Sequence, residues 1–199
     1  MTNPSEPSGV EKIKAASDYL RGTIAAELAN QQDAFDEDTA QLLKHHGMYQ
    51  QDDRDRRNAK DAQGNRLGKA YSLMVRVKLP GGRLTAEQLV AQLDLCDELG
   101  NSTARITDRQ DLQLHGVLKR NVRQAIRRIN EVQLTTLGGC GDVVRNVMCC
   151  PAPLRNDPVR DEMQQMASNL SSCLLPRSTA YHEIWLTDPE TGEIGRAHV

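Results

Sequence analysis

Residues 71–79 alternate between apolar and polar side chains, and this alternation restricts the possible folds more than any other feature of the chain. The apolar positions are Tyr71, Leu73, Val75, Val77 and Leu79. Because successive side chains of a strand point to opposite faces of a sheet, the segment is predicted to be a strand with one buried and one polar face. The Pro-Gly-Gly at residues 80–82 ends this strand.

The next elements are predicted from capping and turn signals. Thr85 and Gln88 form a capping box, which predicts the start of a helix, and Gly100 predicts its end. Residues 103–116 are interpreted either as one bent strand or as two strands joined near residues 108–110.

A second helix and a further strand complete the pattern. Asn121 is in position to cap a helix, and residues 142–150, DVVRNVMCC, form a candidate strand. The order β-α-β(β)-α-β over about eighty residues predicts an α+β fold with a ferredoxin-like split βαβ half-domain.

The flanking segments give simpler expectations. Residues 10–30 have a helical period of apolar side chains, and another helix is expected to begin at Asp157. Residues 50–69 have almost no apolar side chains, which predicts an exposed loop or arm. Residues 181–186, YHEIWL, are predicted to form a short strand.

The segment 103–116 carries an unusual set of polar side chains. If it is extended, one face holds Arg105, Thr107, Arg109, Gln113 and His115. Residues 104–128 contain seven Lys or Arg against two Asp, which favours an anionic ligand such as phosphate, nucleic acid or a polycarboxylate. For the basic residues at 119–128 we expect an ordinary solvated helix face, whereas the strand arginines are harder to explain without a ligand.

Several classes of function lack sequence support. The five cysteines are an odd number without a C-x-x-C motif, which favours free thiols in a reducing, cytoplasmic setting, and Cys140, Cys149 and Cys150 do not match zinc spacing. The glycine pairs do not form a nucleotide-binding motif, and no apolar run is long enough to span a membrane.

Two alternatives remain from the residues alone. A βαββαβ domain with a basic face could be a non-catalytic module that binds RNA or another polyanion. However, such modules stack bases on strand aromatics, and no Phe, Tyr or Trp occurs between Ser72 and Ala180. The other alternative is an α+β domain whose arginines belong to an ordinary exposed sheet surface.

Six segments together resemble the N-terminal third of the hemoproteins in the sulfite/nitrite reductase family. They are YLRGTIAAEL at 19–28, HHGMYQQDDRDRR at 45–57, VRVKLPGG at 75–82, ARITDRQDLQLHG at 104–116, GDVVRNVMCCPAP at 141–153 and LLPRSTAYHEIWL at 174–186. The resemblance implies an oxidoreductase of sulfur assimilation that reduces sulfite to sulfide by six electrons. It also implies a sirohaem that is coupled to a 4Fe–4S cluster.

The resemblance assigns roles to individual residues. Arg76 and Arg145 match the two arginines that hold the substrate oxyanion. The match to the sirohaem-contacting strand comprises Arg105, Thr107, Arg109, Gln113 and His115. The cluster cysteines and two substrate-binding lysines of the family have no match in this sequence, so no metal ligand is assigned.

The resemblance also divides the chain. It implies an N-terminal helix and extended arm at 1–68, a ferredoxin-like domain at 69–136 and the truncated start of a sirohaem/4Fe–4S α+β domain at 137–192. We therefore expect a catalytically incompetent fragment. Residues 193–199, EIGRAHV, match one reading frame of a common sequencing adapter and are expected to be a scar. The electron donor is expected to be an NADPH flavoprotein or ferredoxin, and nitrite stays open as an alternative substrate.

Overall fold

The computed structural model describes residues 7–152, 154, 156–187, 191 and 193 of the chain. It has an α+β fold in which four antiparallel strands form one sheet in the order β1-β2-β4-β3. The strands are β1 (Met48–Asp52), β2 (Tyr71–Val77), β3 (Ala104–Ile106) and β4 (Leu112–Val117). The helices are α1 (Gly9–Ala16), α2 (Ile24–Ala29), α3 (Glu37–His45), α4 (Arg54–Asn58), α5 (Ala86–Leu99), α6 (Val122–Glu131), α7 (Pro158–Cys173) and α8 (Ala180–Leu186). Short 3₁₀ turns lie at Pro80–Gly82 and Lys119–Asn121.

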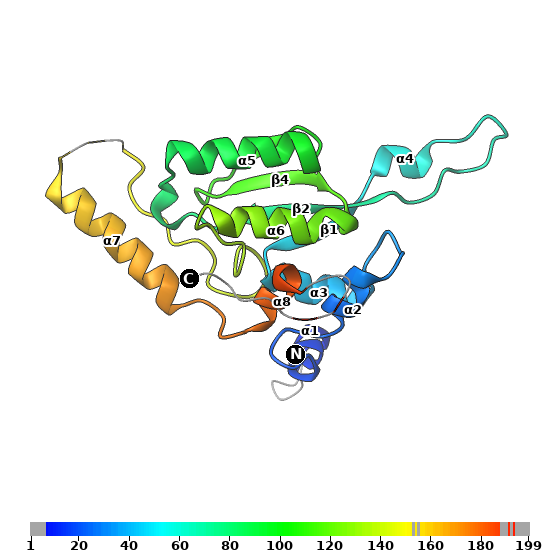
Figure 1. Cartoon of the computed structure of the whole chain (residues 1–199), viewed down its shortest axis with the longest axis horizontal. Coiled ribbons are helices and arrows are strands. Elements are labelled where there is room, and N and C mark those ends of the chain that lie inside the picture. Colours follow the sequence, from blue (N-terminus) through cyan, green and yellow to red (C-terminus); the bar gives the residue numbers. More distant parts are fainter. Residues whose placement is uncertain (1–6, 153, 155, 188–190, 192, 194–199) are drawn as a thin grey trace, which may run out of the picture.

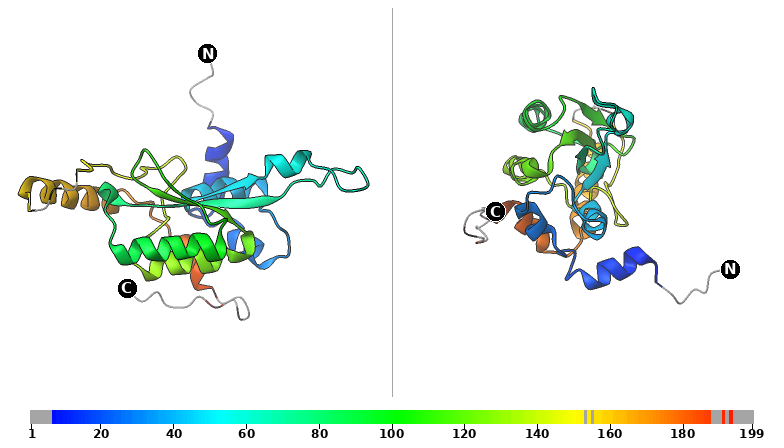
Figure 2. Two further views of the ribbon diagram at one scale, coloured as in Figure 1. Left: turned by 90° about the horizontal axis from the view of Figure 1, so that it is seen from above. Right: turned by 90° about the vertical axis from the view of Figure 1, so that its right-hand side faces the viewer.

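Helices α5 and α6 lie side by side against one face of the sheet (Figures 1 and 2). Leu95 of α5 and Ile126 of α6 are completely buried. Val75 and Leu114 of the two central strands are also buried and belong to the same hydrophobic cluster. Since burying one such side chain stabilises the folded state by about 1.5–3 kcal/mol, this layer forms the core.

The predicted split βαβ unit is confirmed. Strand β4 lies between β2 and β3 and is antiparallel to both, so β2 and β3 run parallel and are connected through α5. Residues 103–116 form two strands and not one bent strand. The turn between them contains Gln110 with a φ of 62°, where the chain reverses. The capping box of Thr85 and Gln88 is present at the start of α5.

The prediction of a strand at residues 142–150 is wrong. The edge of β2 beyond the split unit is occupied by β1, which pairs with β2 from Met48 to Asp52. Thr135 forms a bridge with Lys78 at the other end of that edge. Because the backbone groups along this edge of β2 are already paired, residues 142–150 cannot add another strand to it. The pairing also corrects the arm prediction, because residues 50–52 belong to a strand.

The prediction of one helix over residues 10–30 is also wrong. Helix α1 ends at Ala16, and three consecutive residues, 18–20, have positive φ angles before α2 begins. This conformation is costly for residues other than glycine. It is held by hydrogen bonds, because Ser17 Oγ accepts from the Leu20 N–H at 3.0 Å and the Leu20 carbonyl lies 2.8 Å from His46 Nε2.

Near the C-terminal end, one element is confirmed and one is wrong. Helix α7 follows Asp157, whose side chain caps it as predicted. Residues 181–186 are part of helix α8 and not a strand. Tyr181 and Ile184 are buried at a spacing of three residues, which suits one face of a helix, and Tyr181 Oη accepts a hydrogen bond from the Thr136 N–H at 3.0 Å.

Helix α7 and the arm that contains α4 extend from opposite ends of the sheet (Figure 1). No helix in the described part of the chain is long and apolar enough to cross a membrane. Of the expected adapter-derived scar at 193–199, only Glu193 is described, and residues 194–199 lie outside the described residues.

Candidate active site

Three strands place a row of polar side chains on the sheet face opposite α5 and α6. In the register of the sheet, Arg76 of β2 lies opposite Gln113 of β4, and Gln113 lies opposite Arg105 of β3. His115 is two residues further along β4 and shares this face. The shared face of Arg105, Gln113 and His115 agrees with the period of two in the sequence.

The side-chain amide of Gln113 connects Arg76 to His115. With the amide oriented as its neighbours require, its oxygen accepts from Arg76 Nη2 at 2.5 Å and Nε at 3.0 Å. The amide nitrogen then donates to His115 Nε2 at 3.3 Å. Because Gln113 is buried, this chain of bonds fixes the plane of the Arg76 guanidinium.

The other residues that the resemblance assigns to the sirohaem lie on the edge strand β3 and in the turn that follows it. They are Arg105, Thr107 and Arg109. Arg105 and Arg109 are exposed, and neither forms an ion pair in the described part of the chain. Thr107 Oγ1 accepts from the backbone N–H groups of Arg109 and Asp111, both at 3.2 Å. Thr107 therefore shapes the turn, and the two arginines are available to an anionic ligand.

Arg76 and Arg145 line one cavity of about 330 Å³. Arg145 Nε donates to the Gly141 carbonyl at 3.2 Å, and Arg76 Nη1 lies 3.5 Å from the Gly139 carbonyl. The cavity is also lined by Val10, Gln41, Lys44, His45, Tyr49, Met74, Cys140, Gly141 and Asp142. Two arginines that are distant in the sequence thus share one small, mainly cationic space.

Burial changes the ionisation of several groups around this cavity. It raises the pKa of the Cys140 thiol, although Arg76 and Arg145 act in the opposite direction. It lowers the pKa of His45 and of His115, and nearby cations lower both further. At neutral pH the cavity therefore contains a neutral thiol and a neutral imidazole beside its cations.

Of the eleven lining residues only Arg76 and Arg145 were predicted from the sequence; those that were not include Lys44, His45, Tyr49 and Cys140. Of these four, the first three lie at the end of α3 and in β1, and they reach the cavity only because β1 pairs with β2. No local pattern indicates that pairing. Residues 45–52 therefore pack on the chain's own sheet.

Four of the five basic residues at 119–128, all except Arg120, have internal partners in the described part of the chain. Arg127 Nη2 donates to the Trp185 carbonyl at 3.0 Å, and Arg123 Nη1 donates to the Thr187 carbonyl at 2.6 Å. These bonds occupy carbonyls at the C-terminal end of α8. The charge of this segment consequently does not require an anionic ligand.

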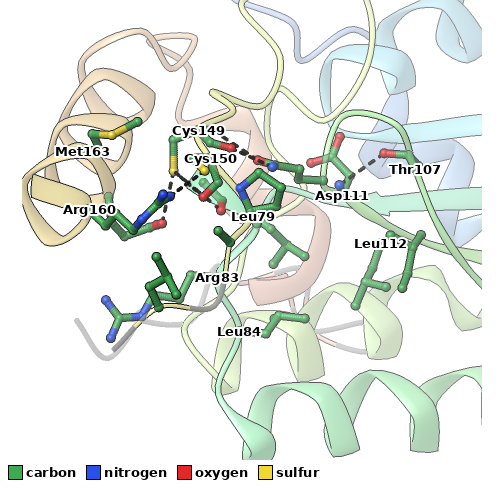
Figure 3. A pocket seen from close by; sticks show the side chains of 18 of the residues that line it. Leu79, Arg83, Leu84, Thr107, Asp111, Leu112, Cys149, Cys150, Arg160 and Met163 are labelled. Atoms are coloured by element: carbon green, nitrogen blue, oxygen red, sulfur yellow. Dashed lines mark hydrogen bonds between the residues drawn. The ribbon is translucent and has the colours of Figure 1, made fainter. Parts of the chain in front are cut away.

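A second cavity of about 600 Å³ lies between the β3–β4 turn and α7 (Figure 3). Thr107 is the one predicted site residue that lines it. Cys150 Sγ accepts a hydrogen bond from Arg160 Nη1 at 2.6 Å, and the pKa of Cys150 is lowered by the Ala152 N–H and by Arg160. Among the described residues, no group of three or more His, Cys, Asp or Glu side chains is arranged to hold a metal ion.

Comparison with known families identifies the central unit. The family described as the nitrite/sulfite reductase ferredoxin-like half domain matches residues 66–132. The chain belongs to the nitrite/sulfite reductase family. This membership favours the reductase half-domain over an RNA-recognition module with the same order of elements.

Curated relatives of the nitrite/sulfite reductase family match most of the chain. The sulfite reductase (NADPH) hemoprotein beta-component of Staphylococcus saprophyticus is 50% identical, over 89% of this chain and 31% of that protein. The one from Bacillus subtilis is 45% identical, over 92% of this chain and 32% of that protein. The sulfite reductase (NADPH) subunit beta of Schizosaccharomyces pombe is 48% identical over 94% of this chain. The chain thus spans 31–32% of the length of these bacterial relatives.

A solved structure supports the same fold. The NirA protein of Mycobacterium tuberculosis superposes with a TM-score of 0.61 and 30% sequence identity. The match covers 73% of this chain and 28% of that chain.

Proposed function

We propose that this chain supplies the oxyanion-binding residues and half of the sirohaem site of an assimilatory sulfite reductase hemoprotein. The observation that carries the proposal is the shared cavity of Arg76 and Arg145, next to a sheet face that bears Arg105. The enzyme reduces sulfite to sulfide by six electrons. We include in the proposal the division into an arm at 1–68, a ferredoxin-like domain at 69–136 and the beginning of a cofactor domain at 137–192.

The residues of the sheet face fit a sirohaem. That tetrapyrrole carries several carboxylates, and desolvated carboxylates require positive partners. Arg105 and Arg109 provide guanidinium groups that form no ion pair in the described part of the chain. Gln113 and His115 add directional polar groups beside them. The sirohaem and its 4Fe–4S cluster would supply the electrons, and we propose that the cluster ligands lie outside Cys140, Cys149 and Cys150.

The chain's own residues bind and orient the substrate. Arg76 and Arg145 offer permanently charged N–H donors to the oxygens of a pyramidal oxyanion. Gln113 and the Gly141 carbonyl hold the two guanidinium groups in place before the anion arrives. Donors that are fixed in a water-poor cavity stabilise charge on the leaving oxygens without reorganising.

The names of the relatives support a proposal for the electron donor. They specify NADPH, so we propose an NADPH-dependent flavoprotein as electron donor, ahead of ferredoxin. We further propose that the enzyme is cytoplasmic. Nitrite is a second candidate substrate because the same two arginines suit either oxyanion.

The test is to express the complete gene that contains this sequence in a host that makes sirohaem, and to record the visible spectrum and iron content. We expect a coloured, iron-containing protein that consumes sulfite. Arg76→Ala and Arg145→Ala should lower sulfite turnover at least tenfold and retain the haem, whereas Arg109→Ala should lower haem occupancy. A colourless, iron-free protein refutes the proposed function, and the reverse pattern among the variants refutes the assigned roles.

A further inference from the structure

The two adjacent histidines at 45–46 have different environments. His46 is completely buried, its Nε2 lies 2.8 Å from the Leu20 carbonyl, and its ring stacks on Tyr181. His46 is therefore a structural residue. His45, in contrast, makes no side-chain hydrogen bond at either ring nitrogen in the described part of the chain, whereas His46 lacks a partner only at Nδ1. An unpartnered polar ring of this kind requires a separate explanation.

The position of His45 points to the cavity of Arg76 and Arg145. His45 ends α3, is 2% exposed and lines that cavity. Its Nδ1 packs against Gly141, where an added Cβ would lie only 2.9 Å away. The His45 carbonyl accepts from the Gly138 N–H at 2.8 Å, which fixes the end of the helix. With Nδ1 against the backbone, Nε2 is the ring nitrogen left for a ligand.

The charges around His45 favour a neutral ring in the absence of an anion. Burial lowers the pKa of His45, Lys14 and Lys44 lower it further, and Asp142 and Glu11 act against them. The charged groups that face His45 or share its cavity are Glu11 and Lys14 of α1, Lys44 of α3, Arg76 of β2, and Asp142 and Arg145 of the segment after Gly139. The cations outnumber the acids.

We propose that His45 is a third anion-contacting residue of this cavity, and that its imidazole takes up a proton from water when a divalent oxyanion enters beside Arg76 and Arg145. The inference rests on the proposed function, because it takes sulfite to be the anion. An incoming dianion offsets the repulsion between the cations and supplies the acceptor that the ring lacks. Protonation and anion binding are then linked, so each strengthens the other by the same factor.

The test uses the 199-residue chain itself, with ¹⁵N-labelled histidines and sulfite added without oxygen. Imidazole NMR follows each histidine from pH 5 to 8 with and without the anion. We expect sulfite to raise the titration midpoint of His45 by about one pH unit, which is a tenfold change in its proton affinity. His182, which is exposed on α8, should keep its midpoint and serves as the internal control.

Two variants separate the contributions of Arg145 and His45 to the sulfite response. Arg145→Gln should abolish the sulfite-induced change at His45 and keep the titration in buffer. Sulfite itself changes its protonation between pH 5 and 8. Its affinity for the wild type is therefore compared at each pH with its affinity for His45→Gln. The wild type should gain on the variant as the pH falls from 8 to 5, and the gain approaches the tenfold limit of a one-unit shift only below both midpoints.

The outcomes distinguish this inference from the proposed function. A saturable sulfite response that depends on Arg145 but leaves the His45 midpoint unchanged overturns the inference. Absence of saturable sulfite binding by the chain also overturns it. The colour and iron content of the complete protein do not depend on either result, so a colourless protein removes the proposed function separately.

Discussion

Asp111 combines complete burial with a cationic neighbourhood. Its side chain is 0% exposed, and neither carboxylate oxygen forms a well-directed hydrogen bond in the described part of the chain. Burial raises the pKa of Asp111 to about 6, although Arg76 and Lys78 favour the charged form. Burial also lowers the pKa of Lys78, whose Nζ contacts the Val144 carbonyl at 3.5 Å. Asp111 and Lys78 thus form a partly compensated pair of buried charges close to Arg76.

This environment predicts a stability that depends on pH. Because the pKa of Asp111 is higher in the folded than in the unfolded state, its stabilising contribution is complete below about pH 4 and is lost as the pH rises through about 6. Asp111→Asn removes the charge and should gain up to about 3 kcal/mol relative to the wild type at pH 7, but almost nothing at pH 4. Urea unfolding at both pH values measures the difference. The exposed Asp108→Asn is the control, and an equal effect of Asp111→Asn at both pH values would contradict the prediction.

Among the elements, the attachment of β1 depends on a close approach at Gly47. The φ angle of Gly47 is +80°, and an added Cβ would lie 2.1 Å from the Thr136 carbonyl oxygen. The Gly47 carbonyl accepts from the Arg76 N–H at 2.8 Å. The same residue therefore sets the distance between β1 and the segment after α6, and it supports the backbone of Arg76.

Gly47→Ala should consequently destabilise the chain by about 3 kcal/mol or more, since both the backbone angle and the clash with a carbonyl are unfavourable. Gly64→Ala is the matched control. Gly64 has a similar φ of +86°, but an added Cβ meets nothing within 4 Å, so only the cost of the backbone angle, about 1–2 kcal/mol, remains. Urea unfolding of both variants tests the difference, and equal losses would show that the close approach does not matter.

The sequence predicts the elements whose signals are local. The alternation at 71–79, the capping box at Thr85 and the shared face of Arg105 and Gln113 all follow from neighbouring residues, and the structure agrees. The failures depend on distant partners. A six-residue segment of mixed polarity such as YHEIWL suits a strand or a helix equally, and its packing on α6 decides. Likewise, no pattern in residues 45–52 indicates that they join β2 and bring His45 into the cavity.

In the described part of the chain, the hydrophobic core is formed by the sheet with α5 and α6 and is extended by buried side chains of α3 and α8. Helix α7 lies apart from them (Figure 1), and only Ala167 and Ser171 of that helix are buried. Val159 and Met166 are 66% and 57% exposed on it. Its main polar attachment is the hydrogen bond from Gln164 Nε2 to the Pro80 carbonyl at 2.6 Å.

This uneven burial predicts that α7 opens without unfolding of the sheet. In native-state hydrogen exchange, α7 amides should have a free energy of opening at least 1.4 kcal/mol below that of β2 and β4 amides, which corresponds to a tenfold difference in protection. Gln164→Ala should raise exchange in α7 further and leave β2 unchanged. Gln165→Ala is the control, because Gln165 is exposed and, among the described residues, its side chain bonds only to Asn169 of the same helix. If α7 and β2 amides instead exchange with the same free energy of opening, the two elements unfold together, and the prediction is wrong.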